Sequence, residues 1–416
     1  MNKNAPLTIG VIGSGVIGTL TAYTLKRKKN YSVSLFDENL PGTQTSMGNA
    51  GTFAHYACIP INSEDIFKKL PFLLFSNSSP LSIQWKNLFS IYPWLIKFLQ
   101  NCSKEKVNNI ITQLSIILQK ASIANNNLFN EINFGSLINN NETLYLYETE
   151  KDFLRDKKNN DLRKSKNIDL TEISSREINE IEPNLNKNFY RGTLFKGSKF
   201  TTNPLKFVNK IYEEFLKNNG KFFNKKIIKI KNEENKIIIQ DNLNDSYKFD
   251  KLIICTGSFS NNLANMLGET FPMITERGYH LMYNDCKNII SRPISVVNQG
   301  MYYIPMEEGL RAAGTVEIGI NDKSINTKRT NWMHKNTISN FNINNDPNKV
   351  WLGYRPTLPD SLPVIGKSKN NENIIYNFGH QHLGLTLATI SAEIILNIIE
   401  DKKNKDFETF SPNRFN

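Results

Sequence analysis

Cysteine and histidine are scarce in this chain, which limits the metal chemistry that it can carry. Its 416 residues include four cysteines and five histidines. The cysteines are Cys58, Cys102, Cys255 and Cys286. They stand far apart without a C-x-x-C pair and the histidines are also dispersed, so we expect isolated thiols and no metal site.

Long uncharged apolar runs are also missing. No stretch of about 18 residues is apolar and free of charge, so we expect no transmembrane helix. The first expected strand begins by about Leu7, which leaves no room for a signal peptide. These two absences predict a cytoplasmic protein. The chain of 416 residues is longer than one ordinary hydrophobic core supports, so two domains are the default expectation.

Nucleic-acid-binding motifs are absent as well, although the formal net charge is +12. Much of the lysine lies in asparagine-rich, irregular stretches such as 157–160 and 402–405. No helix-turn-helix, RNP or zinc-finger pattern accompanies it. We interpret the charge as solvated surface lysine and expect no nucleic-acid partner.

The clearest positive signal is a βαβ unit at the N-terminus. A short apolar run precedes a glycine-spaced turn, and a helix-compatible stretch follows from Thr19 to Lys28. A second apolar run, from Tyr31 to Phe36, ends in Asp37. The turn has the G-x-G-x-x-G spacing of a dinucleotide-binding fingerprint. Strand, helix, second strand and acid all fall where that mechanism needs them.

Each glycine of this fingerprint has its own expected task. Gly13 permits the tight turn out of the strand, Gly15 lets the backbone approach a pyrophosphate, and Gly18 lets helix and strand pack closely. Asp37 would accept hydrogen bonds from an adenosine ribose, which disfavours NADP. The pattern leaves FAD and NAD open.

Two later loops have the composition of cofactor contacts. After the βαβ unit, small and hydroxyl residues dominate a loop in which Thr45 and Ser46 would offer hydroxyls to phosphate or ring atoms. Farther on, a predicted strand over 251–255 runs directly into Thr256 and Gly257. The carboxyl end of a strand is where ligands lie in a doubly wound sheet.

The rest of the chain alternates between helical and strand-like segments without an internal repeat. Helices are predicted over 106–132, 174–181, 204–216 and 385–399, and strands over 143–147, 226–230, 236–240 and 374–378. Ser174 and Glu177 have the spacing of a capping box. Residues 271–345 contain short alternating strands, at 279–283, 294–297, 301–304 and 310–315. They predict an antiparallel sheet that forms a second domain.

Residues 66–102 are rich in aromatic and aliphatic side chains, with lysines at positions 68, 69, 86 and 97. The ordinary interpretation is core packing between domains. The alternative is a surface-seeking amphipathic segment, with tryptophan and lysine at a membrane interface.

Five blocks, taken in their order and spacing, resemble the FAD-dependent D-amino-acid oxidase superfamily. The likeness is greatest to the small subunits of bacterial D-amino-acid dehydrogenases. The blocks are the opening fingerprint, Thr45-Ser46-Met47-Gly48-Asn49-Ala50-Gly51, Cys255-Thr256-Gly257, Gly353-Tyr354-Arg355-Pro356-Thr357-Leu358-Pro359-Asp360 with Gly366, and Gly379-His380 with Gly384. The resemblance spans nearly the whole chain and selects FAD over NAD.

The resemblance implies an α/β fold in which a Rossmann-like FAD-binding domain is interleaved with an antiparallel-sheet α+β substrate domain. The FAD-binding domain would collect the N-terminal βαβ unit, the middle strands and the C-terminal helix. On this basis we expect FAD-binding parts at 1–80, 201–270 and 346–416. The substrate-domain parts are expected at 81–200 and 271–345.

It also implies an FAD site assembled from all three FAD-binding parts. The expected cofactor-binding residues are Gly13, Ser14, Gly15, Val16, Ile17, Gly18, Asp37, Glu38, Thr45, Ser46, Asn49, Ala50, Gly51, Ile228, Thr256, Gly257, Gly379, His380, Leu383, Gly384, Leu385 and Thr386. Backbone N–H groups from Leu383 to Thr386, at a helix N-terminus, would stabilise negative charge at the flavin N1–C2=O edge. No residue pattern requires a covalent link to the flavin.

Arg355 is the first candidate for catalysis. It lies in the G-x-R-P block, whose arginine binds the substrate carboxylate in the family. A guanidinium can hold a carboxylate through two hydrogen bonds and so orient it as well as neutralise it. The plainer role for this arginine is a structural salt bridge.

Other polar side chains are candidates for the pocket. Tyr302 matches a pocket tyrosine of related amine oxidases, with Tyr303 on the opposite strand face as a rival. His382 occupies a position that holds a substrate-contacting side chain in some relatives; a solvated loop histidine is the alternative. His55 and Tyr56 follow the expected flavin-contact loop and line either the pocket or the core.

The implied reaction is the oxidative deamination of a D-amino acid to a 2-oxo acid and ammonia. Arg355 would hold the carboxylate so that the substrate Cα–H faces flavin N5, and positioning then carries catalysis without a strong general base. Electrons would pass to a quinone or respiratory carrier, met at the membrane through 66–102. The protein would then be peripheral on the inner face of the cytoplasmic membrane.

Three alternatives remain open at this point. One is an oxygen-dependent oxidase of glycine, sarcosine or D-amino acids. Another is a D-proline or D-hydroxyproline dehydrogenase. The third is a non-catalytic FAD-binding subunit or a tRNA-modifying accessory domain, against which Arg355 argues.

Overall fold

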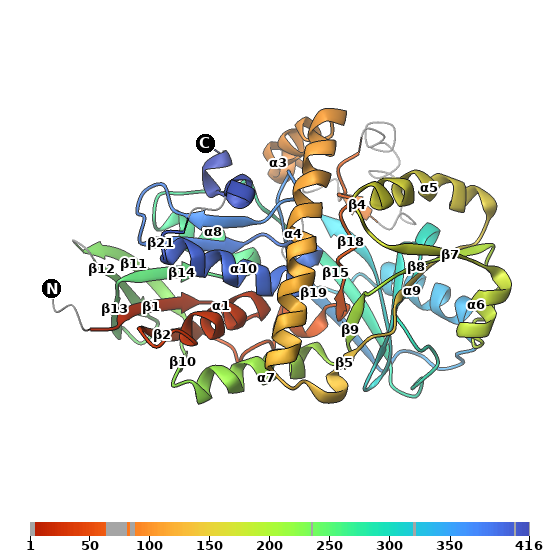
Figure 1. Ribbon diagram of the computed structural model, residues 1–416, viewed down its shortest axis with the longest axis horizontal. Coiled ribbons are helices and arrows are strands. Elements are labelled where there is room, and N and C mark those ends of the chain that lie inside the picture. Colours follow the sequence, from red (N-terminus) through yellow and green to blue (C-terminus); the bar gives the residue numbers. More distant parts are fainter. Residues whose placement is uncertain are drawn as a thin grey trace.

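The computed structural model describes residues 5–63, 81–83, 88–233, 236–318, 322–402 and 405–415. These residues form two halves, each built on a sheet, and the long helix α4 (Lys104–Glu131) runs between the halves (Figure 1). The strands of the first half come from both the N-terminal and the C-terminal parts of the chain. The expected fold class, a Rossmann-like part interleaved with an antiparallel part, is confirmed.

The first half is built on a six-stranded sheet in the order β10-β2-β1-β14-β21-β20. Neighbours pair in parallel except β20, which runs antiparallel to β21. The central strands consist mostly of consecutive apolar residues, because both faces of the sheet are covered. The strands are β1 (Leu7–Ile12), β2 (Tyr31–Asp37), β10 (Lys221–Asn224), β14 (Lys251–Ile254), β20 (Val364–Lys367) and β21 (Ile374–Phe378).

Helices cover one face of this sheet. Helices α1, α7 and α10 pack together with α4 against sheet residues such as Ile9, Val33 and Ile253. Their bounds are α1 (Val16–Lys26), α7 (Pro204–Lys217) and α10 (Gly384–Ile399). The stretch Gln381–Ile399 is long and apolar enough to cross a membrane, but 61% of it is buried, and α10 is a core helix of this layer.

A separate antiparallel sheet and α8 (Ser260–Asn265) cover the opposite face. Its strands are β11 (Ile227–Glu233), β12 (Lys236–Asp241) and β13 (Ser246–Phe249). The strands expected at 226–230 and 236–240 therefore do not join the parallel sheet, as the middle strands were expected to do. Only a few residues connect β11 to β12, and so short a connection gives an antiparallel hairpin.

The second half is a nine-stranded sheet in the order β19-β15-β18-β17-β16-β6-β8-β7, with β4 on β18. It is mostly antiparallel, as predicted for residues 271–345. The strands are β4 (Leu81–Ile83), β6 (Thr143–Tyr147), β7 (Leu170–Ser174), β8 (Arg191–Phe195), β15 (Ile274–Tyr283), β16 (Ile294–Val296), β17 (Met301–Met306), β18 (Gly309–Ile318) and β19 (Lys349–Thr357).

Strand β19 lies in this large sheet, although we expected the FAD-binding part to resume at 346. It pairs with β15 from Lys349 to Thr357, with Arg355 opposite Glu276 and Trp351 opposite His280. The backbone hydrogen bonds of β19 therefore belong to the large sheet. By this pairing, the chain returns to the first half only after Thr357.

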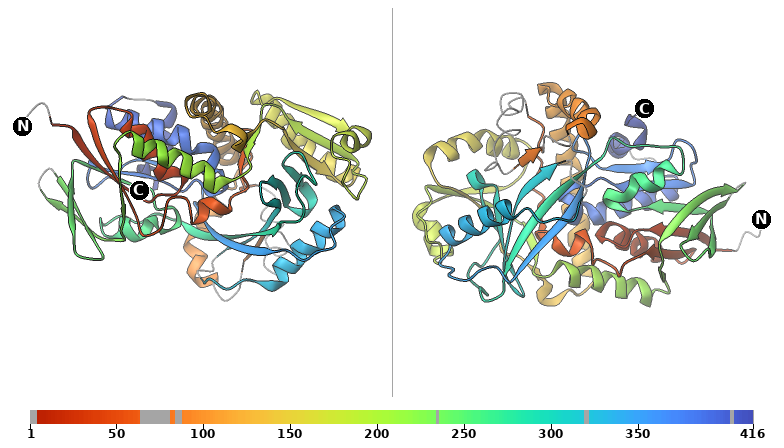
Figure 2. Two further views of the ribbon diagram at one scale, coloured as in Figure 1. Left: turned by 90° about the horizontal axis from the view of Figure 1, so that it is seen from below. Right: turned by 180° about the vertical axis from the view of Figure 1, so that it is seen from behind.

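Helices α6 (Ser175–Ile181) and α9 (Thr327–Asn340) pack on the outer face of the large sheet. Figure 2 shows α9, in light blue, on this face. The capping box of Ser174 and Glu177 is confirmed, since both of its reciprocal hydrogen bonds form. The remaining elements are α3 (Leu88–Gln100), α5 (Glu150–Ser165), η3 (Gly135–Leu137), η5 (Val297–Gln299), η7 (Lys405–Phe410), η8 (Pro412–Phe415) and a small sheet of β3 (Thr52–Phe53), β9 (Lys199–Thr201) and β5 (Ile138–Asn139).

Only part of the aromatic segment 66–102 can be described, since 66–80 and 84–87 lie outside the described residues. In α3, Trp94 and Phe98 stack on each other and are buried. On the same helix Tyr92 and Ile96 are exposed. The described part therefore contributes to a core and also presents apolar side chains to solvent. A membrane contact stays a prediction.

Candidate active site at the junction of the two sheets

The glycine turn after β1 is fixed by backbone contacts. Gly13 has φ +102°, and a Cβ there would lie 2.5 Å from the carbonyl oxygen of Cys255. A Cβ on Gly18 would overlap the carbonyl oxygen of Gly13, because α1 crosses β1 at this point. Positions 13 and 18 therefore accept only glycine. Gly15 has an ordinary φ of −65°.

The start of α1 has the properties of an anion site. The hydroxyl of Ser14 is buried and has no hydrogen-bond partner among the described residues. The N–H of Val16 donates to Ser46 Oγ (2.9 Å), which leaves the Ser46 proton available for a further acceptor. Hydroxyl protons and helix N–H groups suit the oxygens of a pyrophosphate, so these residues fit a dinucleotide.

The residues expected at the adenosine end lie where β2 ends. Asp37 accepts hydrogen bonds from the N–H of Ser14 (2.7 Å) and of Asn39 (2.8 Å). Oδ1 also accepts from Asn39 Nδ2 (3.5 Å), whereas Oδ2 keeps a lone pair for a ribose hydroxyl. Glu38 pairs with Lys226 (3.1 Å), and Ile228, on the adjoining strand β11, is 43% exposed. Their contact with adenosine stays a prediction.

The loop expected to contact the flavin folds around its own side chains. It begins with the turn η1 (Thr45–Gly48). Asn49 donates to the carbonyl oxygen of Ser46 (2.6 Å) and accepts from the N–H of Gly51 (2.6 Å). Gly51 has φ +67° and, with Ala50, leads into β3. Side chains and backbone thus hold the loop in one shape.

Three side chains of the large sheet, Arg311, His280 and Trp351, hold this loop from the other half. Arg311 is 9% exposed and donates to the carbonyl oxygens of Asn49 (2.6 Å) and Met47 (3.2 Å). His280 Nδ1 lies 3.1 Å from the carbonyl oxygen of Gly48, and the His280 ring stacks on Trp351. Burial lowers the pKa of Arg311 to about 10 and that of His280 to about 3. At neutral pH the first is charged and the second is neutral, so the neutral imidazole donates from Nδ1.

The second loop follows β14 and is open where a ligand would lie. In the turn η4 (Gly257–Phe259), Gly257 has φ +56°, and a Cβ there would meet no atom within 4 Å. The hydroxyl of Thr256 lies 3.2 Å from that of Ser260. Ser258 donates instead to the carbonyl oxygen of Tyr354, in the large sheet (3.1 Å).

The third cofactor segment is the turn η6 (Gln381–Leu383) at the start of α10. Gly379 has φ +83°, and His380 Nε2 lies 2.9 Å from Ser391 Oγ inside α10. Burial lowers the pKa of His380 to about 3, so it supports the helix as a neutral ring. The N–H of Leu383 donates to the His380 carbonyl oxygen (2.8 Å) and is not free for the flavin. The following N–H groups have no acceptor inside the helix.

Thr386 and a buried asparagine of α4 join this helix to the flavin loop. Thr386 Oγ1 accepts from the N–H of Ala54 (2.9 Å). Asn125 Nδ2 donates to the carbonyl oxygen of Thr386 (2.9 Å) and lies 3.2 Å from His55 Nε2. Burial lowers the pKa of His55 to about 4, so its neutral ring accepts at Nε2. Neither Asn125 nor this role of His55 was expected from the sequence.

Arg355 lies across β15 with its guanidinium half-buried. Its Nη1 donates to Glu276 Oε1 (2.8 Å), and the other oxygen of this buried carboxylate accepts from Thr357 Oγ1 (3.1 Å). A Cβ on Gly278 would lie 2.5 Å from Nη1, so glycine gives the guanidinium its room. The structural salt bridge considered for Arg355 is thus present. Nε and Nη2 have no hydrogen-bond partner in the described part of the chain.

The structure brings His382 together with Arg355. His382 is exposed to solvent, yet protein surrounds it closely enough that desolvation lowers its pKa. Glu276 raises this pKa and Arg355 lowers it, so both charges act on the ring. The turn η6, which carries His382, also contacts β19, which carries Arg355.

Tyr302 belongs to a different cluster. Its hydroxyl lies 2.7 Å from that of Tyr56, which stacks on Phe195. Burial raises the pKa of Tyr302, so it stays protonated. Tyr303 is excluded as a rival, because its side chain is buried among the residues that α9 covers and accepts from Asn340. Two strands separate β17, with Tyr302, from β19, with Arg355.

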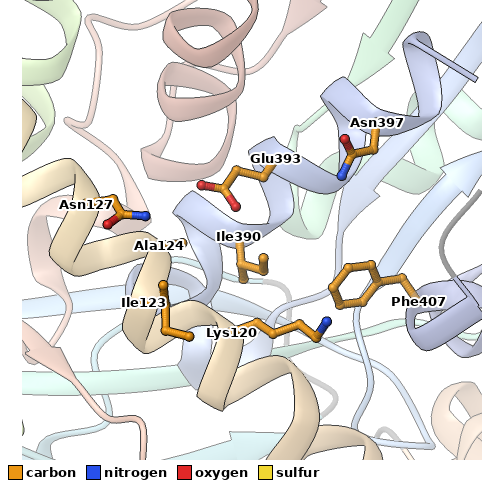
Figure 3. A pocket seen from close by; sticks show the side chains of 8 residues that line it. All are labelled: Lys120, Ile123, Ala124, Asn127, Ile390, Glu393, Asn397 and Phe407. Carbon is orange, nitrogen blue, oxygen red and sulfur yellow. The ribbon is translucent and has the colours of Figure 1, made fainter. Parts of the chain in front are cut away.

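A groove of about 230 Å³ lies apart from these residues, between α4 and α10 (Figure 3). It is lined by Lys120, Ile123, Ala124, Asn127, Ile390, Glu393, Asn397 and Phe407. None of the expected site residues is among them. In the described ranges, no three His, Cys, Asp or Glu side chains are grouped to hold a metal ion.

The geometry defines a class of protein. A parallel sheet with a glycine turn is joined by three loops to a large antiparallel sheet that carries a half-buried arginine. This combination is typical of an oxidoreductase that binds a dinucleotide in one half and its substrate against the other. Comparison with known proteins gives the particular family. The model of the FAD dependent oxidoreductase family DAO matches residues 8–398, and the chain belongs to this family.

Individual relatives agree with this assignment. A D-amino-acid oxidase of Bradyrhizobium diazoefficiens is 28% identical over 98% of both chains. A D-amino acid dehydrogenase of Rhizobium rhizogenes is 26% identical over 95% of this chain and 97% of the relative. The crystal structure of glycine oxidase from Geobacillus kaustophilus has the same fold, with a TM-score of 0.76 at 15% identity over 97% of each chain. The predicted family, enzyme class and FAD cofactor are confirmed.

Proposed function

We propose that this protein is an FAD-dependent dehydrogenase that converts D-amino acids to 2-oxo acids and ammonia, and that it passes the electrons to a quinone or another respiratory carrier. Two relatives that align with nearly the whole chain are named for D-amino acids. The observation that carries the proposal is Arg355. Its guanidinium is half-buried beside the loops expected to hold FAD and keeps Nε and Nη2 available.

In the proposed mechanism the chain binds and orients the substrate. Arg355 holds the carboxylate through its free nitrogens, while Glu276 and Thr357 keep the guanidinium from turning. His382 is neutral because its pKa is lowered, so it adds no second positive charge beside the substrate amine. FAD, held at Gly13–Gly18, Ser46 and the start of α10, would supply the acceptor for the hydride that leaves Cα. The amine loses a proton in the same conversion, and water hydrolyses the resulting imino acid.

The FAD contacts expected at Gly13–Gly18, Ser46, Asn49–Gly51, Thr256, Gly257, Gly379, His380 and Leu383–Thr386 are part of this proposal. The Thr45 hydroxyl is not, because it donates to the Tyr354 carbonyl oxygen (3.1 Å). The cytoplasmic location is also part of the proposal, with α3 as the contact to the inner face of the membrane. The exposed Tyr92 and Ile96 support that contact.

Replacing Arg355 tests the proposal. The wild-type protein is first mixed anaerobically with each of a panel of D-amino acids, glycine, sarcosine and D-proline. The compound that reduces the flavin is the substrate. We expect Arg355→Ala to lower kcat/KM for it by about 100-fold or more, and Arg355→Lys to recover only part, since lysine lacks the planar fork. Unchanged turnover in Arg355→Ala would contradict the carboxylate-binding role.

An oxygen-dependent D-amino-acid oxidase is the second candidate, favoured by the name of the Bradyrhizobium relative. The electron acceptor distinguishes the two. After anaerobic reduction, the protein is exposed either to air or to a soluble quinone, and flavin absorbance is followed. Fast reoxidation by quinone and slow reoxidation by air support the dehydrogenase. Fast reoxidation by air supports the oxidase.

A further inference from the structure

Strand β19, which carries Arg355, is the edge strand of the large sheet. One side of its backbone pairs with β15, and no strand covers the other side in the described ranges. An edge strand leaves every second N–H and C=O without a ladder partner. The carbonyl of Tyr354, directly before Arg355, is one of these groups.

Two hydroxyls from the FAD-binding half meet on this carbonyl. Thr45 Oγ1 donates to Tyr354 O at 3.1 Å, and Ser258 Oγ donates to the same oxygen at 3.1 Å. The two donors come from loops that follow different strands, β2 and β14. A carbonyl oxygen has two lone pairs, so the two protons satisfy it completely.

These hydrogen bonds to the Tyr354 carbonyl limit which further hydrogen bonds Thr45 and Ser258 can donate. A hydroxyl has a single proton, whereas phosphate oxygens only accept. With its proton engaged by Tyr354, Thr45 has none to give to a pyrophosphate. Ser46, its neighbour, is different: its oxygen accepts from Val16 and its proton remains available. The loop therefore separates two tasks between adjacent hydroxyls.

The Tyr354 carbonyl belongs to the same peptide unit as the N–H of Arg355. Fixing that planar unit fixes the point from which the Arg355 side chain starts. The far end is fixed as well, since Glu276 holds Nη1. The backbone of Arg355 is thus held by the cofactor loops, and its guanidinium is held by Glu276 of β15.

We propose that Thr45 and Ser258 are positioning residues, which set the distance between the carboxylate-binding Arg355 and the flavin through the Tyr354 carbonyl. The inference rests on the proposed function of Arg355. Transfer of a hydrogen from Cα needs close and oriented approach, and a misplacement of about 1 Å can lower a rate by roughly 100-fold.

The test compares Thr45→Val, Ser258→Ala and the double variant with the wild type, all as FAD-loaded protein. Measurements are the FAD content after gel filtration, the anaerobic rate of flavin reduction, and the affinity for anthranilate, a carboxylate probe followed by flavin absorbance. We expect full FAD content throughout. The limiting reduction rate should fall by about 2-fold to 3-fold in each single variant and about 10-fold or more in the double variant. Anthranilate affinity should change less than the rate.

Two control variants distinguish a loss of positioning from general damage to the loop as the cause of a lower reduction rate. Thr45→Ser keeps the proton and should restore the wild-type rate. Thr43→Val removes a hydroxyl that bonds only to the Leu40 carbonyl oxygen in the same loop, and it should have no effect. A wild-type rate in the double variant would overturn the inference. Loss of FAD in proportion to the lost rate would also overturn it, because Thr45 and Ser258 would then be cofactor ligands.

Arg355→Ala in the same assay distinguishes failure of the inference from failure of the proposed function. If Arg355→Ala loses anthranilate binding while the double variant behaves as wild type, only the positioning role is wrong. If Arg355→Ala binds anthranilate normally, the carboxylate-binding role is wrong and the positioning role falls with it.

Discussion

The glycine turn at Gly13–Gly18 and the edge strand around Arg355 are built in opposite ways. In the turn the critical contacts are with rigid backbone: a Cβ on Gly18 would meet the carbonyl oxygen of Gly13, and a Cβ on Gly13 would meet that of Cys255. Around Arg355 the critical contacts come from Thr45, Ser258 and Glu276, which are far apart in sequence. The turn is fixed by backbone atoms, whereas the edge is assembled from side chains where two sheets meet.

This difference determines what a substitution does. A side chain added to the turn meets rigid backbone, so the fold must change. A side chain added beside Arg355 meets the flexible end of another side chain, so the fold can survive while the guanidinium moves. Substitutions in the turn should therefore lower the stability of the fold, whereas substitutions beside Arg355 should lower the activity.

The largest expected effect is at the turn. Gly18→Ala places a methyl group onto the Gly13 carbonyl oxygen, and we expect a loss of more than about 4 kcal/mol of unfolding free energy, with no FAD retained. Gly15→Ala is the matched variant, since Gly15 has an ordinary φ and its Cβ would lie 3.2 Å from Ser46 Oγ. It should change stability by less than about 1 kcal/mol and still weaken FAD binding. Urea unfolding and FAD content check both. A stable, yellow Gly18→Ala protein would contradict the comparison.

The next effect is at the edge. Gly278→Ala would bring a methyl group to 2.5 Å from Arg355 Nη1 and displace the guanidinium. We expect kcat/KM for the amino acid to fall by about 30-fold, or about 2 kcal/mol, because the carboxylate contact loses its geometry. The thermal midpoint and the FAD content should stay close to wild type. A variant that loses stability and activity together would show that the edge is as rigid as the turn.

A third effect concerns the pH dependence of stability at the contact that His280 makes with the flavin loop. The folded pKa of His280, about 3, lies below its ordinary value of 6.5, so the neutral form stabilises the fold above pH 6.5. This contribution is lost as pH falls from 6.5 toward 3, at up to about 1.4 kcal/mol per pH unit. His280→Gln should remove it and flatten the acid side of the profile.

Urea unfolding between pH 7.5 and pH 4 measures this profile. The control is His334→Gln, on α9, where the ring contacts Tyr283 and Asp346 away from the loop. We expect the control to keep the wild-type slope. Equal slopes in His280→Gln and the wild type would mean that this contact does not depend on a neutral histidine.

The smallest effect on the enzyme itself is expected in α3, which belongs to neither region. Replacing the exposed Tyr92 and Ile96 by serine should change stability by less than about 0.5 kcal/mol each and leave turnover with a soluble acceptor unchanged. Flotation with anionic liposomes should decrease, because the two apolar side chains no longer enter the interface. Trp94→Ser, at a buried position, should instead destabilise the protein. Equal flotation of the double variant and the wild type would remove α3 as a membrane contact.

The local parts of the fold were predictable from the sequence. The βαβ unit, the capping box at Ser174 and the helix at the C-terminus follow from periodicity, glycine spacing and short-range hydrogen bonds. The domain limits were less accessible. Nothing in the residues of Lys349–Thr357 (KVWLGYRPT) says with which sheet this strand pairs, because its partner β15 is about 70 residues away in sequence.

The site was predictable as a set of segments but not as an arrangement. Arg355 and His382 were predicted through motifs, and the structure brings them together. Tyr302 was found in the same way and lies in a separate cluster. Glu276, Arg311 and Asn125 have no motif, since a single polar residue inside a strand or helix carries no local signal of its partner.

By itself the sequence predicted a dinucleotide site at Gly13–Gly18, because glycines at this spacing dictate the path of the backbone between strand and helix. It also predicted which segments would surround the cofactor. Only the tertiary structure decided that Thr45 and Ser258 converge on the Tyr354 carbonyl and that Glu276 holds Arg355. Such contacts depend on how two sheets meet, and sheet packing is a sum over many side chains that no short stretch of sequence contains.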